Sequence, residues 1–365
     1  MPTTSVYVAA VSRRVVEIVG EPLTDLPDIA TDTAAFLQPG RVLLAGGKRT
    51  RARLAALGWS CVRPGSVWDE PALVMAGSSL ELFQAAALVH DDIIDDADTR
   101  RGNPAAHRHF AARHRDEDLR GDAGVFGASA SMLLGDLLLS LGQREIGRAI
   151  RAEGPHAFRA LEVWDQMTAE VAIGQYLDIE AAALRLPPEG DDGAHRDALG
   201  RAFTVLRHKS AHYSVAHPLA LGAALAGANE EVFSRLGGIA EPLGEAFQLR
   251  DDDLGIFGDP AITGKPAGDD LGEGKRTPLV LLGLSRTSGP ERDRILAALG
   301  NDHLTDEEVE EARKCLVRCG AVAAHEAMIE ERRGAALAAV DASGFDPAVR
   351  ALLREVIDLL TTRDR

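Results

Sequence analysis

Four carboxylates lie within six residues, directly after an apolar segment of the chain. The apolar run extends from Leu80 to His90, and Asp91, Asp92, Asp95 and Asp96 follow it. On a helix these acids stack in two pairs one turn apart, and each like-charge pair weakens an isolated helix by about 0.2–0.5 kcal/mol. A divalent cation that prefers oxygen ligands converts this repulsion into ligation. The pattern therefore predicts a buried helix that ends at a cation site, although an acidic helix end in solvent has the same sequence.

A second acidic cluster, Asp251-Asp252-Asp253, follows another apolar run later in the chain. Two such clusters on apolar helices predict two walls of one metal site. The segment from Asp259 to Arg276 comes directly after the second cluster and is rich in glycine and proline. Such a segment cannot form one continuous helix, and long loops in compact domains are usually functional. We therefore expect it to act as a lid over the metal site.

Helical periodicity dominates the rest of the chain, and no run alternates in the manner of a β-strand. Pro- and Gly-containing breakers separate the helical segments, and no linker is long enough to divide the chain. The sequence predicts an all-α protein with a single domain over residues 1–365 and minor or absent sheet. Its motif-bearing core covers residues about 40–285, and C-terminal helices cover 286–365. The predicted helical segments are 72–96, 126–150, 157–186, 196–227, 230–254 and 303–340.

Composition narrows the classes of partner. The net charge of −16 argues against a general nucleic-acid surface, which needs clustered Lys and Arg, but a few aimed cations can still bind a phosphorylated substrate. The cysteines Cys61, Cys315 and Cys319 form no disulfide framework, which predicts a reducing cytoplasm. Cys315 and Cys319, with His325 nearby, could begin a metal site, but free cysteines on a helix are more often small core residues. We expect no secretory signal and no transmembrane segment, because no run approaches about 20 apolar residues.

Basic residues accompany the acidic clusters. Arg100 and Arg101 follow the first cluster, and the turn Gly46-Gly-Lys-Arg-Thr-Arg51 lies upstream. Glycines let the backbone approach an anion, although this turn is not a P-loop. Carboxylates that hold Mg²⁺ beside guanidinium groups are what a diphosphate site requires.

Together these motifs resemble those of the trans-prenyltransferases, also called isoprenyl diphosphate synthases or polyprenyl synthetases, and in particular geranylgeranyl diphosphate synthases. The resemblance extends from residue 46 to about 280 and keeps the family's order and spacing. It implies the isoprenoid synthase fold, a helical bundle around a deep central cavity, with the two aspartate clusters facing each other across its mouth. The residues that carry it are Gly46–Arg51, Gln84, Asp91–Asp95 with Arg100-Arg101-Gly102, Gly135-Asp136, Gly174-Gln175, Lys209-Ser210, Phe247–Asp252, Gly264-Lys265, Asp269-Asp270 and Gly274-Lys275.

The resemblance also implies a role for each matching residue. The metal ligands, which would hold three Mg²⁺ ions, are Asp91, Asp92, Asp95, Asp251 and Asp252. The residues that bind the allylic diphosphate are Arg100, Lys209, Gln248 and Lys265, of which the last three also form the catalytic group. The residues that bind isopentenyl diphosphate are Lys48, Arg51, Gln84 and Arg101. The implied reaction joins the two substrates into a linear all-trans prenyl diphosphate, and the family resemblance suggests a homodimer.

Two positions depart from the family pattern. Gly255 stands where the fullest form of the second motif has an aspartate, so metal binding there rests on Asp251 and Asp252. Asp253 faces a different side of the helix. Gln84 stands where many relatives have histidine, and either side chain can position a phosphate.

Product length depends on the helix that ends at Asp91. One helical turn rises about 5.4 Å, which is comparable with one isoprene unit. Ala86 and Ala87 are too small to form a floor for the growing chain, and Phe83 lies one turn further down. This spacing favours geranylgeranyl diphosphate, although a facing segment, Ala128–Met132, is an alternative floor.

Two other functions share part of this pattern. A terpene cyclase has the same fold and the first acidic motif, but cyclases stabilise cations with aromatic faces and this chain has 4% aromatic residues. A non-catalytic partner subunit of a prenyltransferase is expected to have lost carboxylates from one cluster, and both clusters are present here.

Overall fold

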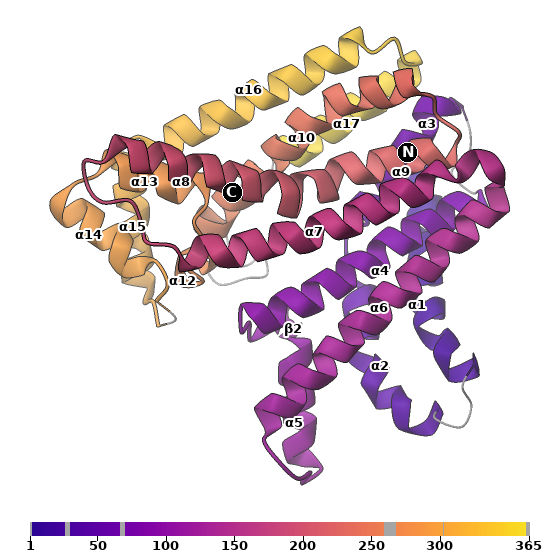
Figure 1. Cartoon of the computed structure of the whole chain (residues 1–365), viewed down its shortest axis with the longest axis horizontal. Helices are drawn as coiled ribbons and strands as arrows, with labels where there is room; N and C mark the ends of the chain where they lie inside the picture. The colour runs from indigo at the N-terminus through magenta and orange to yellow at the C-terminus, as the bar shows by residue number, and fades with distance from the viewer. Residues whose placement is uncertain (1, 26–29, 66–69, 259–267, 302, 363–365) are drawn as a thin grey trace. The chain divides into compact units, whose positions relative to one another are not determined.

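The computed structural model describes residues 2–25, 30–65, 70–258, 268–301 and 303–362 (Figure 1). The chain divides into two compact units, unit 1 (Met1–Trp164 and Pro218–Asn229) and unit 2 (Asp165–His217 and Glu230–Arg365). Helix α7 begins in unit 1 and continues into unit 2. The elements in chain order are α1 (Pro2–Asp25), α2 (Ala30–Ala45), α3 (Thr50–Val62), α4 (Pro71–Ile94), β1 (Thr99–Arg100), β2 (Asn103–Pro104), α5 (Ala106–Asp116), α6 (Ala123–Glu153), η2 (Pro155–Ala157), α7 (Arg159–Ala183), α8 (Asp192–Val205), η3 (Leu206–Ala216), α9 (His217–Leu225), α10 (Glu230–Phe257), α12 (Asp269–Gly272), α13 (Pro278–Arg286), α14 (Gly289–Ala298), α15 (Asp306–Arg318), α16 (Ala321–Ala342) and α17 (Pro347–Thr361).

Unit 1 is built around α4, which packs along most of its length against α6 (Figure 1). Pro71 occupies the first turn of α4, where its missing N–H leaves no helical bond unmade. Apolar side chains on several sides of α4, including Leu73, Leu80 and Leu82, are fully buried. Helix α4 is therefore a core helix whose C-terminal end bears the first acidic cluster.

Unit 2 has α10 as its central helix, with α16 and η3 packed against it. Cys315 is fully buried in the apolar cluster between α13, α15 and α16, so this cysteine acts as a small core residue. A charged network ties the helices together: Glu245 of α10 accepts hydrogen bonds from Arg207 and Arg332, each at 2.5 Å. These bonds join α10 to both of its neighbours.

The structure confirms the helical prediction and corrects its boundaries. The predicted helix 303–340 is two helices, α15 and α16, because the helix is interrupted at Gly320, whose φ of 75° suits glycine. The predicted segment 196–227 is formed by α8, η3 and α9 in succession, and the π-helical stretch η3 connects the two α-helices. Helices α1, α2, α3, α5, α12 and α13 were not predicted, whereas α14 and α17 lie in the region that was expected to hold C-terminal helices. Within the described residues the only sheet is the two-stranded hairpin β1–β2.

Two helices, α4 and α6, are long and apolar enough to cross a membrane by length and composition. The expectation that no segment reaches this length was therefore wrong. In α4, 72% of the apolar window is buried, as in a core helix of a folded domain, whereas in α6 the buried share is 33%. Helix α6 thus presents apolar residues at its surface, including Val125, Met132 and Leu133.

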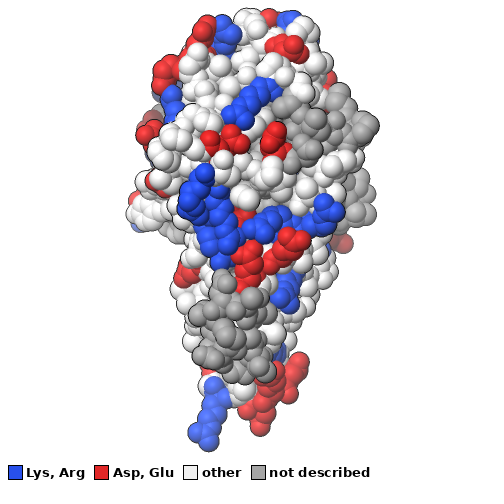
Figure 2. Space-filling model, turned by 90° about the vertical axis from the view of Figure 1, so that its right-hand side faces the viewer, with Lys and Arg blue, Asp and Glu red and all other residues white. Residues whose placement is uncertain are grey.

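Lys and Arg side chains lie next to Asp and Glu side chains on the face shown in Figure 2, and neither sign covers that face continuously. On this face the charge is therefore distributed among local groups of both signs. A phosphorylated ligand would be attracted by particular cations on such a surface and not by a general field.

Candidate active site

The first acidic cluster lies at the C-terminal end of α4. Asp92 is 2% exposed and accepts a 2.7 Å hydrogen bond from Nε of Arg100, whose Nη2 also lies 3.8 Å from Oδ2 of Asp91. Asp95 caps the helix, and its backbone N–H donates to the carbonyl of Asp91. The three predicted metal ligands of this cluster therefore share one helix end, with a guanidinium beside two of them.

The β1–β2 hairpin places the two arginines. Arg100 pairs with Asn103 across the hairpin, and the turn consists of Arg101 and Gly102, whose φ angles are 53° and 74°. Positive φ at both turn residues is the geometry that two-residue hairpins favour. Arg100 thereby bonds to the acidic cluster, whereas Arg101 donates to the carbonyls of Leu43 and Gly46.

The basic turn contributes two kinds of cation. Arg49 is 3% exposed and structural: it donates to Ser12 and pairs with Glu81 at 3.4 Å. Lys48 is exposed, and Arg51 is half-buried on the first turn of α3. Lys48 and Arg51 are thus the two cations of this turn that can reach a ligand.

Several guanidinium groups lie close together in unit 1. Burial lowers the pKa of Arg101, the charge of Glu81 opposes this, and the nearby charges of Arg49, Arg100 and Arg51 lower it further. Neighbouring positive charges repel one another, and this repulsion is unfavourable unless an anion binds beside them. The geometry therefore fits a diphosphate beside Arg101, with Gln84 half-buried on the neighbouring α4.

The second acidic cluster lies on α10 in unit 2. Asp251 is exposed, whereas Asp252 is 7% exposed and accepts a 2.9 Å hydrogen bond from Nε2 of Gln248. Burial, together with the charges of Asp270 and Asp251, raises the pKa of Asp252 well above its usual value against the opposing effects of Gln248 and a lysine. A buried group of carboxylates in which one resists ionisation fits a divalent cation, which removes the mutual repulsion.

Asp270 fills the space beside Gly255. A Cβ built on Gly255 would lie 1.9 Å from Oδ2 of Asp270, so no side chain fits at position 255 while Asp270 keeps its place. The carboxylate that the sequence lacks at position 255 is thus present in space, supplied by α12. This position of Asp270 was not predicted, because Asp270 is fifteen residues away from Gly255 in the chain and entered only as part of the family pattern. Asp253 bonds to Arg250 at 3.2 Å instead of joining the cluster.

Lys209 lies on η3, where α7 approaches unusually closely. Its Nζ donates a 2.5 Å hydrogen bond to Oδ2 of Asp178 on α7. The approach depends on Gly174, because a Cβ there would lie 2.5 Å from the backbone nitrogen of Lys209. Gly174 is thus a packing residue that sets the position of Lys209, and Asp178 is a partner of Lys209 that was not predicted from the sequence. Lys265 lies outside the described residues.

The predicted floor residues all lie on α4. Phe83 is 4% exposed, and its ring meets that of Trp164 edge to face at 5.8 Å. Ala86 is fully buried and Ala87 is partly exposed. Phe83 therefore has a fixed position eight residues before Asp91.

The predicted site residues thus fall into two groups, one in each unit. Unit 1 brings together the first acidic cluster, the basic turn and both hairpin arginines. Unit 2 brings together the second acidic cluster, Gln248 and Asp270, and it also carries Lys209. The approach of the two groups across a cavity stays a prediction.

Comparisons with known proteins decide the family. The sequence model of the polyprenyl synthetase family matches residues 33–316, which is more than half of the chain. The chain belongs to the polyprenyl synthetase family. A crystal structure of geranylgeranyl pyrophosphate synthase from Corynebacterium glutamicum, complexed with isoprenyl diphosphate and magnesium, has a TM-score of 0.89 and 35% identity and covers 98% of this chain and 99% of its own.

Two relatives show how product length varies in the family. The short chain isoprenyl diphosphate synthase of Methanocaldococcus jannaschii is 30% identical over 75% of this chain and 74% of its own length. The nonaprenyl diphosphate synthase of Mycobacterium tuberculosis is 28% identical over 84% of this chain and 80% of its own. Membership therefore establishes a trans-isoprenyl diphosphate synthase with the all-α isoprenoid synthase fold, in a family that uses Mg²⁺ and isoprenyl diphosphates. It does not establish the product.

Proposed function

We propose that this polyprenyl synthetase extends dimethylallyl, geranyl or farnesyl diphosphate with isopentenyl diphosphate and that its main product is geranylgeranyl diphosphate. The observation that carries the product length is the buried ring of Phe83. Its Cα lies about 12 Å along the helix axis from that of Asp91, because each helical residue rises about 1.5 Å. The edge contact with Trp164 prevents the ring from turning aside, which makes it a suitable floor.

The proposed metal ligands are Asp91, Asp92 and Asp95 in unit 1 and Asp251 and Asp252 in unit 2. Asp270 is a further candidate because it occupies the space beside Gly255. When bound, three Mg²⁺ ions would neutralise the diphosphate leaving group and so favour its departure. This arrangement uses all the buried carboxylates of both clusters except Asp253.

The remaining polar residues bind and orient the two substrates. Arg100, Lys209, Gln248 and Lys265 hold the allylic diphosphate, and the cations among them stabilise its negative charge as the carbon–oxygen bond breaks. Lys48, Arg51, Gln84 and Arg101 hold isopentenyl diphosphate. Its double bond attacks the allylic carbocation, and the departing diphosphate takes the proton that is then lost. No side-chain nucleophile is required.

A product assay tests this proposal. Purified protein with Mg²⁺, isopentenyl diphosphate and each allylic diphosphate in turn should yield mainly geranylgeranyl diphosphate. Release of a cyclic hydrocarbon would instead support the terpene cyclase, and no consumption of isopentenyl diphosphate would support a non-catalytic partner subunit.

The variant Phe83→Ala tests the floor. Removing the ring should lengthen the product by at least one isoprene unit. The matched control is Phe110→Ala, which removes a ring that is 1% exposed on α5 and should leave product length unchanged. If Phe83→Ala folds and makes the wild-type product, Phe83 is not the floor, and the segment Ala128–Met132 becomes the next candidate.

We also propose that the chain is a cytoplasmic homodimer that pairs through α6. Val125, Met132 and Leu133 lie on one side of α6 at seven- and eight-residue spacing and are 66%, 54% and 61% exposed. A grouped apolar surface of this kind commonly marks an interface. Sedimentation should give a dimer for the wild type and a monomer for Met132→Glu with Leu133→Glu. Leu359→Glu, at an exposed apolar position on α17, is the control that should remain dimeric.

The single-domain organisation over residues 1–365 is likewise our proposal. One family model spans residues from both compact units, which supports a single functional domain. A single cooperative thermal transition is expected, and two separable transitions would contradict it.

A further inference from the structure

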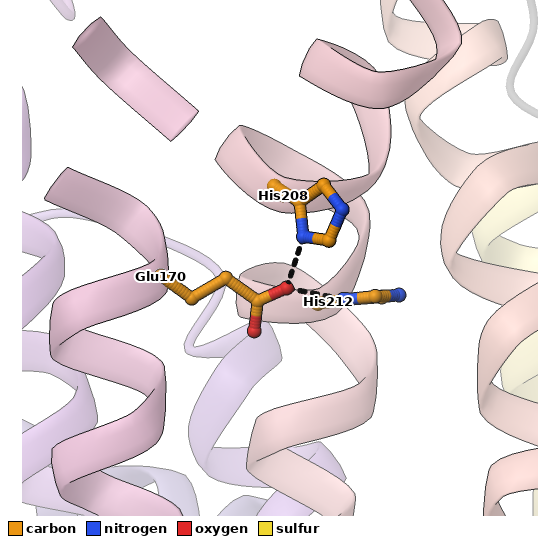
Figure 3. A group of neighbouring side chains, drawn as sticks. All are labelled: Glu170, His208 and His212. Carbon is orange, nitrogen blue, oxygen red and sulfur yellow. Dashed lines mark hydrogen bonds and ion pairs between the residues drawn. The ribbon is translucent and has the colours of Figure 1, made fainter. Parts of the chain in front are cut away.

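A group of one glutamate and three histidines lies in unit 2, outside the residues assigned to the prenyl transfer site. We name it the Glu170 cluster, after the residue at its centre on α7 (Figure 3). Oε1 of Glu170 lies 2.5 Å from Nδ1 of His208 and 2.6 Å from Nδ1 of His212. Its other oxygen, Oε2, lies 2.5 Å from Nε2 of His217. One carboxylate is thus surrounded by three imidazoles.

The backbone of η3 explains how the histidines converge. His208 and His212 are four residues apart, the spacing at which two histidines on one helix bind a metal ion together. In an α-helix, residues five apart point about 140° away from each other. The backbone N–H of His217 instead donates to the carbonyl of His212, five residues back, which is a π-helical bond. The wider turn brings His217 to the same carboxylate, and such turns occur frequently at functional sites.

We propose that the Glu170 cluster binds one divalent transition-metal ion of the zinc class, with Glu170, His208 and His212 as ligands. One oxygen and two nitrogen ligand atoms of these residues lie within 4.8 Å of one another. Zn²⁺ bonds of about 2.0–2.2 Å require ligand atoms about 3.3 Å apart, which small rotations of these side chains provide. Three protein ligands leave one position for water.

His217 acts as a positioning residue in this site. Its bond to Oε2 fixes the orientation of the carboxylate, as hydrogen-bond partners of metal ligands generally do. The side chain of His217 is 10% exposed, whereas that of His208 is 42% exposed. The group is therefore closed on one side and open to solvent at His208, which gives an ion a route of entry.

The chemistry of the ligands separates this site from the aspartate clusters. Carboxylate oxygens alone select Mg²⁺, whereas imidazole nitrogen suits Zn²⁺, Co²⁺, Ni²⁺ and Cu²⁺. Millimolar Mg²⁺ should therefore fill the aspartate clusters and leave the Glu170 cluster available. A bound ion would tie α7 to η3 one residue away from Lys209, next to the bond that Lys209 makes with Asp178.

Titration of the full-length protein with Co²⁺ in millimolar Mg²⁺ tests the proposal. We expect one saturable site per chain with the visible absorption bands of nitrogen-ligated Co²⁺, and displacement of the Co²⁺ by Zn²⁺. Glu170→Gln and His212→Ala should each weaken binding at least about tenfold. The matched control is His195→Asn, which changes a histidine of unit 2 that is 8% exposed on α8, and it should bind as the wild type does.

His208→Ala is a second ligand variant, chosen because His208 is the most exposed of the three histidines and its loss least endangers folding. It too should weaken Co²⁺ binding at least about tenfold. The proposal is overturned if the folded wild type shows no saturable Co²⁺ or Zn²⁺ binding. It is also overturned if His208→Ala and His212→Ala bind the ion as tightly as His195→Asn. The Glu170 cluster would then be an ion-pair group that fastens α7 to η3.

Discussion

Adding one methyl group at Gly174 should move Lys209. The Cβ of Gly174→Ala would lie 2.5 Å from the backbone nitrogen of Lys209 and 2.6 Å from the carbonyl carbon of His208. Non-bonded heavy atoms approach to about 3.5–4.0 Å, so α7 and η3 must separate locally by about 1 Å. Backbone atoms cannot rotate away as a side chain does, and the displacement therefore passes to the residues of η3.

Two opposing effects set the change in stability of Gly174→Ala, and the displacement of Lys209 sets the change in its activity. Overpacking costs about 1–3 kcal/mol of stability, and replacement of a helical glycine by alanine returns about 1 kcal/mol. The net loss of stability should be about 0–2 kcal/mol, so the variant should fold. A displacement of about 1 Å at a residue that positions the substrate costs as much as about 100-fold in rate. Activity should therefore fall much more than stability.

Steady-state kinetics and thermal denaturation measure the two effects separately. The expected result for Gly174→Ala is a large loss of kcat/KM for the allylic diphosphate with a folded protein. The control is Gly237→Ala on α10, where an added Cβ meets no atom within 4 Å and should raise stability slightly at unchanged activity. Wild-type kcat/KM in Gly174→Ala would refute the argument that this close approach positions Lys209 for catalysis.

Three further predictions concern single side chains. Asp270→Asn should raise the Mg²⁺ concentration needed for half-maximal activity about tenfold or more, and the control Asp269→Asn should change that concentration little. Equal dependence of activity on Mg²⁺ in Asp270→Asn and the wild type would exclude Asp270 as a ligand. Burial raises the pKa of Glu245 but its hydrogen bonds to two arginines outweigh this, so its folded pKa lies below its unfolded one. Its stabilising effect is then present above the unfolded pKa of about 4.3 and is lost as the pH falls through the folded pKa. Urea denaturation should show Glu245→Gln less stable by about 2 kcal/mol at neutral pH, with a difference that narrows in acid; a difference independent of pH would contradict the assignment. Burial raises the pKa of Cys61 to about 12, so iodoacetamide should alkylate it at neutral pH far more slowly in the folded protein than in urea, and equal rates by mass spectrometry would show that the thiol is not protected.

The long helices were predictable because their cause is local. Apolar residues at three- and four-residue spacing bury one face of α6 and of α10, and the longer apolar run of α4 is buried on several sides. The break at Gly320 was missed because a glycine inside a periodic segment is often tolerated, and only the observed φ shows that the helix is interrupted there. The π-helical turn of η3 was also missed, because no residue type specifies it.

The residue types of the site were predictable from the sequence, but the contacts that each residue makes in the fold were not. The basic turn has three cations within four residues that look alike in sequence, and only the contacts with Ser12 and Glu81 show that Arg49 is a structural residue. Gly255 looked like a loss at the second cluster until Asp270 was found in the same space. In both cases the deciding neighbour lies elsewhere in the chain.

The sequence by itself determined that this chain is helical, that it carries two groups of carboxylates with accompanying cations, and that these match one family. Those properties depend on periodicity, composition and the order of motifs, which are readable along the chain. Only the tertiary structure decided that Gly174 sets the position of Lys209 and that Glu170 collects His208, His212 and His217. Such contacts join residues that are far apart in the chain, and packing of the folded helices alone brings them within bonding distance.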